Sequence, residues 1–246
     1  MLSSPYITLT IHVLAFGFWS SFWPRRAIKS RLEPRVGFRA YRIFYNLGTI
    51  ALFCTSFGYM AQHSAETPML WNLHGYPWFR PLIYVVNGIG VFFLWAAGHL
   101  GWSFWGFKNP PPDRGLQTAG FYKITRHPLY WSVFCLLFAH MLVFGSVLGI
   151  LYFACMELYN VIGVIVFENR ELARHYGDAV TTFHARTSTL PFKAMLQGRS
   201  QLGRGELPRG TFVGSIVFTI IVGWIHAPVI TQFMYTVPTL ATLLPR

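Results

Sequence analysis

The chain has 246 residues, of which 53% are hydrophobic, 18% are aromatic and only 11% are charged. A soluble domain carries about 25% charged residues, so this composition excludes an ordinary soluble domain and predicts an integral membrane protein. The formal net charge of +12 would suggest nucleic-acid binding in a soluble protein. In a membrane protein we interpret that charge as a topology signal, and we expect no nucleic-acid partner.

Apolar stretches of about 20 residues, the length that crosses a bilayer, recur along the chain. The stretch from residue 128 to residue 167 is too long for one span, and Gly145 and Gly149 mark a hairpin turn within it. We therefore predict an all-α, polytopic transmembrane helix bundle of about six spans, in a single domain covering residues 1–246, with a polar linker at about 197–210. The predicted spans are Tyr6–Trp23, Tyr41–Gln62, Pro81–Phe107, Pro128–Phe144, Leu148–Phe167 and Thr211 to about Thr236.

Eighteen of the 20 Lys and Arg residues fall in three loops between these spans, Arg25–Arg42, Lys108–Arg126 and Arg170–Arg209. Positively charged loops stay on the cytoplasmic or equivalent side of a membrane. Six spans place all three loops on that side and both termini on the other, whereas an odd number would split the loops. We expect a protein of a bacterial plasma membrane or an organelle inner membrane, with its basic loops on the cytoplasmic, matrix or stromal side against the lipid bilayer's anionic headgroups.

Ionisable groups inside a membrane are costly and usually face a functional site. At a rise of about 1.5 Å per residue, His12, His140 and His226 lie at a similar depth on three different spans. Two imidazoles at one depth on separate helices satisfy the axial ligation of a b-type haem. The alternative is that each histidine hydrogen-bonds a neighbouring helix. Glu157, the only acid within a span, is either a proton-relay group or a hydrogen-bonded carboxyl.

The densest polar stretch is GFYKITRHPLY, residues 120–130, where the second basic loop meets the fourth predicted span. Pro128 suits the first turn of a helix. Arg126 and His127 directly precede it, at the positive end of the helix dipole, where an anion or a carboxylate is favoured. This stretch therefore predicts an anion-binding site at the inner face.

A second polar cluster, FENRELARHYGD, occupies residues 167–178 at the inner end of the fifth predicted span. The predicted hairpin brings both clusters to the same face of the membrane. An Arg–His pair facing Glu168 and Glu171 would bind a zwitterionic cofactor, or would simply pair charges at the interface.

Together the two clusters resemble the membrane-embedded isoprenylcysteine carboxyl methyltransferase-like superfamily, which carries an RHPxY element followed by EExxL. The matching residues are Arg126, His127, Pro128, Tyr130, Glu168 and Leu172. Asn169 stands where the superfamily has its second Glu. The resemblance implies an S-adenosylmethionine site at the inner face. Its residues would be Arg126, His127, Tyr130 and Glu168.

Within that superfamily the chain resembles the NnrU family over nearly its whole length. Three stretches carry this resemblance: residues 12–59, with a histidine, a basic loop and an aromatic span; Ala139–His140 after the RHP element; and TSTLPFKAMLQGR, residues 187–199, before a last span that contains a histidine. The resemblance implies one membrane domain rather than several.

The chain is also similar in layout to a relative of this family, a plastid carotene isomerase with a b-type haem between two histidines, whose ligand positions resemble those of His12 and His140 here. The resemblance thus implies that these two histidines are axial ligands of haem iron. In that isomerase a Cys three residues before the second His exchanges as a ligand. Leu137 occupies that place here, and the nearest cysteine is Cys135.

Three functions follow as expectations. The first is a haem b protein performing redox or isomerisation chemistry on an apolar or lipophilic small molecule. The second is an S-adenosylmethionine-dependent membrane methyltransferase. The third is a non-catalytic subunit that assembles with other membrane subunits of a larger, respiratory-type complex.

Overall fold

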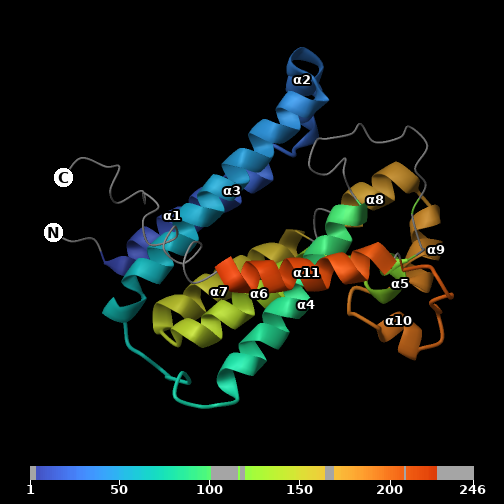
Figure 1. The fold of residues 1–246 in the computed structure, drawn as a ribbon. Coiled ribbons are helices and arrows are strands. Elements are labelled where there is room, and N and C mark those ends of the chain that lie inside the picture. Colours follow the sequence, from blue (N-terminus) through green and yellow to red (C-terminus); the bar gives the residue numbers. More distant parts are fainter. Residues whose placement is uncertain (1–3, 101–115, 117–119, 164–168, 208, 226–246) are drawn as a thin grey trace.

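A computed structural model describes residues 4–100, 116, 120–163, 169–207 and 209–225, and within them the regular structure is entirely helical (Figure 1). This confirms the all-α class. A helix lies in each predicted span: α1 Pro5–Phe22, α3 Phe38–His63, α4 Phe79–Leu100, α6 Pro128–Phe144, α7 Val147–Ile162 and α11 Arg209–Ile225. The predicted span ends at Phe107, Phe167 and Thr236 lie outside the described residues, as do Glu168 and His226.

Two helical segments of the described chain are long and apolar enough to cross a membrane, Phe38–Glu66 with 29 residues and Phe79–Ala97 with 19. Three further apolar helices are shorter, Pro128–Phe144, Val147–Ile162 and Phe212–Ile225. A helix of 17 residues, such as α6, is about 26 Å long, slightly less than a hydrocarbon core of about 30 Å. The six-span bundle therefore stays a prediction.

Helices α1 and α3 form an antiparallel hairpin, and α2, Arg26–Val36, lies at its tip without a buried side chain (Figure 1). The two long helices approach closely at Gly48, because a Cβ there would overlap the Trp19 indole ring. The same indole donates its Nε1 hydrogen to the Tyr45 carbonyl at 3.2 Å. A small residue facing a large ring thus sets the separation of this pair.

The α3–α4 connection is hydrogen-bonded to the α6–α7 turn. The backbone N–H groups of Leu70 and Trp71 both donate to the Gly145 carbonyl, at 2.7 and 3.2 Å. The Val147 N–H donates to the Pro68 carbonyl at 3.0 Å. These contacts, which we call the outer clasp, fix the two connections at one common end of the helices.

The predicted hairpin turn is confirmed at Gly145. This residue ends α6 in the left-handed conformation, with φ of +58°, and α7 begins two residues later. Gly149 instead lies inside the first turns of α7, where its N–H donates to the Ser146 hydroxyl at 3.1 Å. Only the first of the two marked glycines forms the turn.

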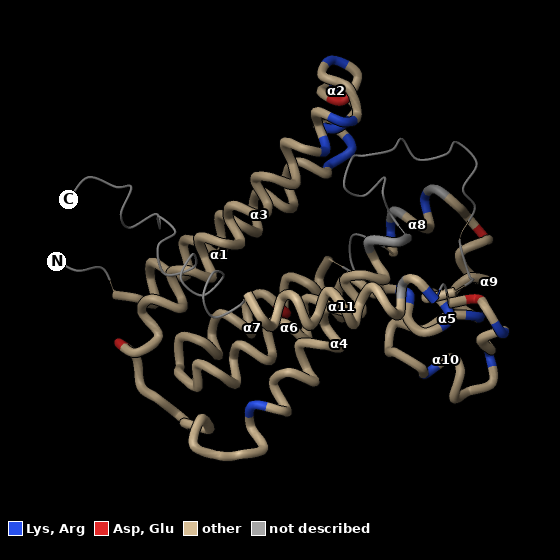
Figure 2. Tube along the Cα trace, in the orientation of Figure 1, with Lys and Arg blue, Asp and Glu red and all other residues tan. Residues whose placement is uncertain are grey.

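Basic residues gather at the helix ends opposite the outer clasp. Figure 2 shows the described Lys and Arg residues at the α2 tip and around the short helices that adjoin α6 and α7. Arg80 lies apart from them, at the start of α4. Because α2 joins the far ends of α1 and α3, the basic segments and the outer clasp occupy opposite helix ends. The short helices are α5 Phe121–Ile124, α8 Asn169–Tyr176, α9 Ala179–Arg186 and α10 Lys193–Leu196.

The predicted polar linker is tied to these short helices over its described residues. The Lys123 ammonium contacts both carboxylate oxygens of Glu206, at 2.6 and 2.8 Å, and donates to the Gln201 carbonyl at 2.7 Å. The Arg199 guanidinium donates to three carbonyls at the end of α9. The linker therefore covers the basic end of the bundle.

Candidate functional site

His12 is held inside the helix bundle on α1. Its side chain is 1% exposed, and its Nδ1 lies 2.8 Å from the Thr8 carbonyl oxygen one turn earlier. Because a carbonyl oxygen only accepts hydrogen bonds, Nδ1 carries a proton, and in the neutral form of this tautomer the ring lone pair lies on Nε2. The Tyr59 ring stacks on the imidazole, with centroids 5.0 Å apart and planes inclined by 21°. The stacked ring covers the face of the imidazole rather than the edge where Nε2 lies.

His140 repeats this local arrangement on α6. Its Nδ1 lies 2.6 Å from the Leu136 carbonyl oxygen, so the same tautomer is fixed. The half-buried ring meets Phe57 edge to face, with centroids 5.0 Å apart. In both predicted haem ligands Nδ1–H is thus anchored to the preceding helical turn, the backbone support typical of metal-binding histidines.

One helix, α3, contacts both histidines. Phe57 and Tyr59 are two residues apart, so they project about 200° apart around α3 and reach the two imidazoles from different sides. Both aromatic rings belong to one buried apolar core of α1, α3, α6 and α7. The core residues are Leu9, Phe16, Phe57, Tyr59, Met60, Ala61, Leu137, Leu148, Tyr152 and Met156. The structure therefore sets both histidines against one core, while iron ligation stays a prediction.

Leu137 is buried in that core. Cys135 faces α4, because a Cβ added at Gly90 on α4 would lie 3.2 Å from its Cβ. Cys54 on α3 instead packs against the core.

The RHP element forms a hydrogen-bonded junction with the segment after α9. The Arg126 N–H donates to the Ser188 carbonyl at 2.8 Å, and its guanidinium donates to the Thr189 hydroxyl at 3.1 Å. The Thr189 carbonyl accepts from the Thr125 hydroxyl at 2.8 Å and from the Trp131 indole at 2.7 Å. Side chains and backbone thus hold residues 188–189 against the start of α6.

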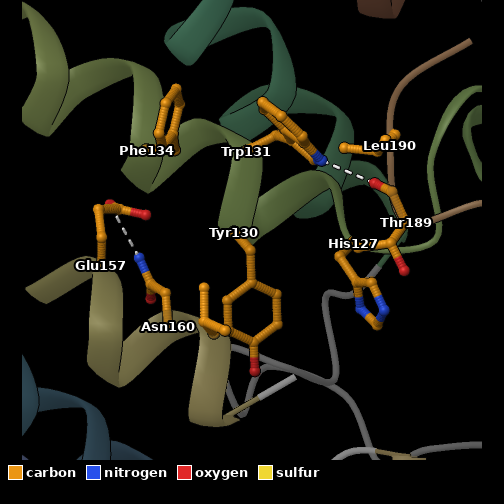
Figure 3. A pocket seen from close by; sticks show the side chains of 9 residues that line it. His127, Tyr130, Trp131, Phe134, Glu157, Asn160, Thr189 and Leu190 are labelled. Carbon is orange, nitrogen blue, oxygen red and sulfur yellow. Dashed lines mark hydrogen bonds between the residues drawn. The ribbon is translucent and has the colours of Figure 1, made fainter. Parts of the chain in front are cut away.

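A cavity of about 320 Å³ lies between α6 and α7 and is capped by that segment (Figure 3). In this view Glu157 and Asn160 lie on one side of Tyr130 and the His127 ring lies on the other. Asn160 Nδ2 donates to Glu157 Oε1 at 3.2 Å, and His127 is 3% exposed. The lining residues are His127, Tyr130, Trp131, Phe134, Glu157, Asn160, Val161, Thr189 and Leu190.

The structure brings together only part of the predicted inner-face site. His127 and Tyr130 line one cavity, with their rings edge to face at 5.6 Å. Arg126 is half-buried behind Thr189 and does not line the cavity. The side chains of the two glutamates at positions 168 and 171 lie outside the described residues, so the carboxylate half of that site stays a prediction.

Six lining residues were not predicted as site residues from the sequence: Trp131, Phe134, Asn160, Val161, Thr189 and Leu190. Asn160 follows Glu157 by three residues, a spacing that places both on one helix face. Their proximity could therefore have been predicted from the sequence. Thr189 and Leu190 reach the cavity only through tertiary hydrogen bonds to α6, which no local pattern indicates.

The described part of the chain is an apolar, all-helical bundle with backbone-anchored histidines and a carboxyl within an apolar helix, which defines its class by fold. The NnrU protein family matches residues 8–232, and the chain belongs to this family.

Two curated relatives are similar to the chain, both named "15-cis-zeta-carotene isomerase, chloroplastic". The protein of Arabidopsis thaliana is 27% identical over 201 residues, which cover 81% of this chain and 53% of the relative. The protein of Zea mays is 26% identical over 211 residues, which cover 84% of this chain and 56% of the relative. The chain thus spans about half the length of these relatives. No solved structure matches it significantly.

Proposed function

We propose that this protein performs isomerase-type chemistry on an apolar small molecule inside a membrane, using haem b held by His12 and His140. The observation that carries this proposal is the pair of backbone-anchored imidazoles against one apolar core. Family membership supports it, because the similar curated proteins are named as isomerases of a carotene, an apolar polyene.

Each of the two histidines, taken by itself, has the backbone support that haem ligation requires. Nδ1–H of each histidine donates to a carbonyl, of Thr8 or of Leu136, which orients the ring and leaves the ligating lone pair on Nε2. Haem b would supply a redox-active iron within the apolar surroundings. The core side chains around the pair would exclude water and favour an apolar substrate.

The methyltransferase alternative has less support from the described residues. S-adenosylmethionine carries a carboxylate, which needs a cation or several N–H donors in a buried site. The cavity beside the RHP element has no Lys or Arg among its described lining residues, and it presents the Glu157 carboxyl instead. The non-catalytic subunit alternative has its own test, which is whether other membrane subunits co-purify with the full chain.

The haem part is tested on the purified, detergent-solubilised full chain. Its visible spectrum is recorded oxidised and after dithionite reduction, for the wild type and for His12→Ala, His140→Ala and His184→Ala. His184 is a matched control because it is half-buried on α9, outside the core. We expect a Soret band and sharp reduced bands that are lost in the first two variants and kept in the third. A colourless wild type after haem supplementation would sink the haem proposal.

The isomerase part has a separate readout. The protein is reconstituted in vesicles that contain a cis-polyene, and the isomers are separated by chromatography. We expect conversion by the wild type and background conversion by His12→Ala. Haem-loaded wild type without conversion overturns the isomerase part and leaves the haem site standing. Saturable binding of S-adenosylmethionine in calorimetry favours the methyltransferase.

A further inference from the structure

The α6–α7 cavity is a second site, separate from the two histidines of the proposed function. It is lined by residues from the first turns of α6, whereas His140 lies near the end of that helix. Phe134 is the lining residue of α6 nearest to His140, and six residues correspond to about 9 Å along the helix. Neither His12 nor His140 lines the cavity, so the proposed function leaves its occupant unassigned.

The cavity has a polar end and an apolar wall. Glu157 and Asn160 form the polar end, and their mutual hydrogen bond of 3.2 Å orients both side chains. Tyr130, Trp131 and Phe134 supply aromatic wall, and the indole N–H of Trp131 is engaged by the Thr189 carbonyl. A ligand with one hydrogen-bonding end and an apolar body matches this lining.

Charge favours an uncharged head group. An anionic head would meet the Glu157 carboxyl with no Lys or Arg among the described lining residues to compensate it. A cationic head would need an ionised Glu157 carboxylate, and ionisation is costly beside the apolar wall of the cavity. A neutral hydroxyl both donates to a carboxyl oxygen and accepts from an amide, so it satisfies the polar end without an unpaired charge.

The cavity is partly open. Val161 and Leu190 line it and are 49% and 50% exposed, so the surface at its mouth is apolar. A volume of about 320 Å³ is near the lower limit of ligand pockets and holds a head group with the first part of a chain. The remainder of a long chain therefore extends through the mouth, where a hydrocarbon phase would receive it.

We propose that this cavity binds a single-chain membrane lipophile whose uncharged, hydrogen-bonding head lies at Glu157 and Asn160 and whose apolar chain leaves between Val161 and Leu190. Binding here requires no haem and no isomerase activity. The site is therefore tested independently of the proposed function.

The test uses the full chain in vesicles and a photoreactive farnesol, with the labelled peptides identified by mass spectrometry. Unlabelled farnesol, squalene, farnesylamine and farnesyl phosphate compete, so that chain chemistry is kept while the head changes. We expect labels on α6 and α7, and farnesol competing about tenfold better than the other three, as the loss of one buried hydrogen-bonded partner implies. Equal competition by squalene overturns the role of the polar end, and stronger competition by the amine or the phosphate overturns the neutral head.

Variants locate the ligand within the cavity. Val161→Trp narrows the mouth and is expected to abolish labelling, whereas Leu158→Trp on the same helix, 61% exposed and outside the lining, keeps it. Glu157→Leu is expected to weaken farnesol about tenfold, and Glu157→Gln, which keeps an acceptor oxygen, less. If Glu157→Leu fails to fold, the Glu157→Gln variant and the competition series still test whether the head group binds at the polar end. Wild-type labelling of Val161→Trp overturns the site.

Discussion

Gly145, at the turn between α6 and α7, is packed too closely against its neighbours to accommodate a side chain. Its φ of +58° is a left-handed conformation that only glycine adopts without strain, and a Cβ would overlap the Trp71 carbonyl oxygen. Its own carbonyl accepts two N–H groups of the outer clasp. One residue thus ends α6 and joins two connections that are distant in the sequence.

We predict that Gly145→Ala destabilises the protein by about 3 kcal/mol or more, because backbone strain and steric overlap add. Gly177→Ala is the matched control. Gly177 follows α8 with φ of +53°, and an added Cβ there meets nothing within 4 Å, so only the conformational cost of about 1 kcal/mol applies. Thermal unfolding in one detergent measures both variants. Equal decreases in the unfolding temperature of the two variants would mean that the structure around Gly145 relaxes to accommodate the added Cβ without a cost in free energy.

At this scale, position in the sequence relative to a helix was informative. His127 and Tyr130 lie together, because His127 directly precedes α6 and Tyr130 lies in its first turn. Glu157 was singled out as the acid of an apolar helix, but its neighbours across the cavity were not predicted. Thr189 lies about sixty residues from the helix it contacts, and such a contact depends on the packed structure rather than on local pattern.

At the scale of elements, the helices that could be predicted from the sequence are those with an apolar pattern and a characteristic first or last residue. Pro128 starts α6 as expected, since its ring suits the first turn. The basic segment Arg25–Arg42 was treated only as a loop, yet it contains α2, in which Lys29 and Glu33 form an i,i+4 ion pair at 3.5 Å. A helix with no buried side chain leaves no apolar periodicity in the sequence, so its existence could not be predicted that way.

The docking of the linker after α10 is predicted to depend on pH. Hydrogen bonds from Lys123 and from the Gly203 N–H lower the pKa of the Glu206 carboxyl below its ordinary value of 4.5. A carboxyl whose pKa is lowered by folding contributes stability that is complete above its unfolded pKa and is lost as the pH falls through its folded pKa. We therefore expect residues 197–207 to stay docked above about pH 4.5 and to detach progressively below it.

Hydrogen exchange of residues 197–207, corrected for the intrinsic rate, measures this detachment as a function of pH. Glu206→Gln is expected to remove the pH dependence while leaving the exchange of α6 unchanged. The prediction fails if protection of the wild-type linker is constant through the acid range.

At the scale of the whole molecule, the connections between the helices lie at two opposite ends of the helix bundle. The outer clasp ties the α3–α4 connection to the α6–α7 turn, so these lie together. The α2 tip and the short helices α5 and α8–α10 adjoin the opposite helix ends, and they carry most of the described Lys and Arg residues (Figure 2). The charge count in the sequence and the packing of the helices therefore group the same connections. A membrane around the helices would meet one basic end and one nearly uncharged end.

We predict that the α2 tip and α8 face the cytoplasm and that the α3–α4 connection faces the opposite side, because basic segments resist transfer across a bilayer. In a chain whose three native cysteines have been replaced by serine or alanine, single cysteines are introduced by Ser30→Cys, Ala173→Cys and Gly75→Cys, at exposed positions. A membrane-impermeant maleimide added to intact bacterial cells is expected to label only Gly75→Cys, and to label the other two after permeabilisation. Opposite labelling of Ser30→Cys and Ala173→Cys would separate the two basic ends and exclude an even number of spans between them.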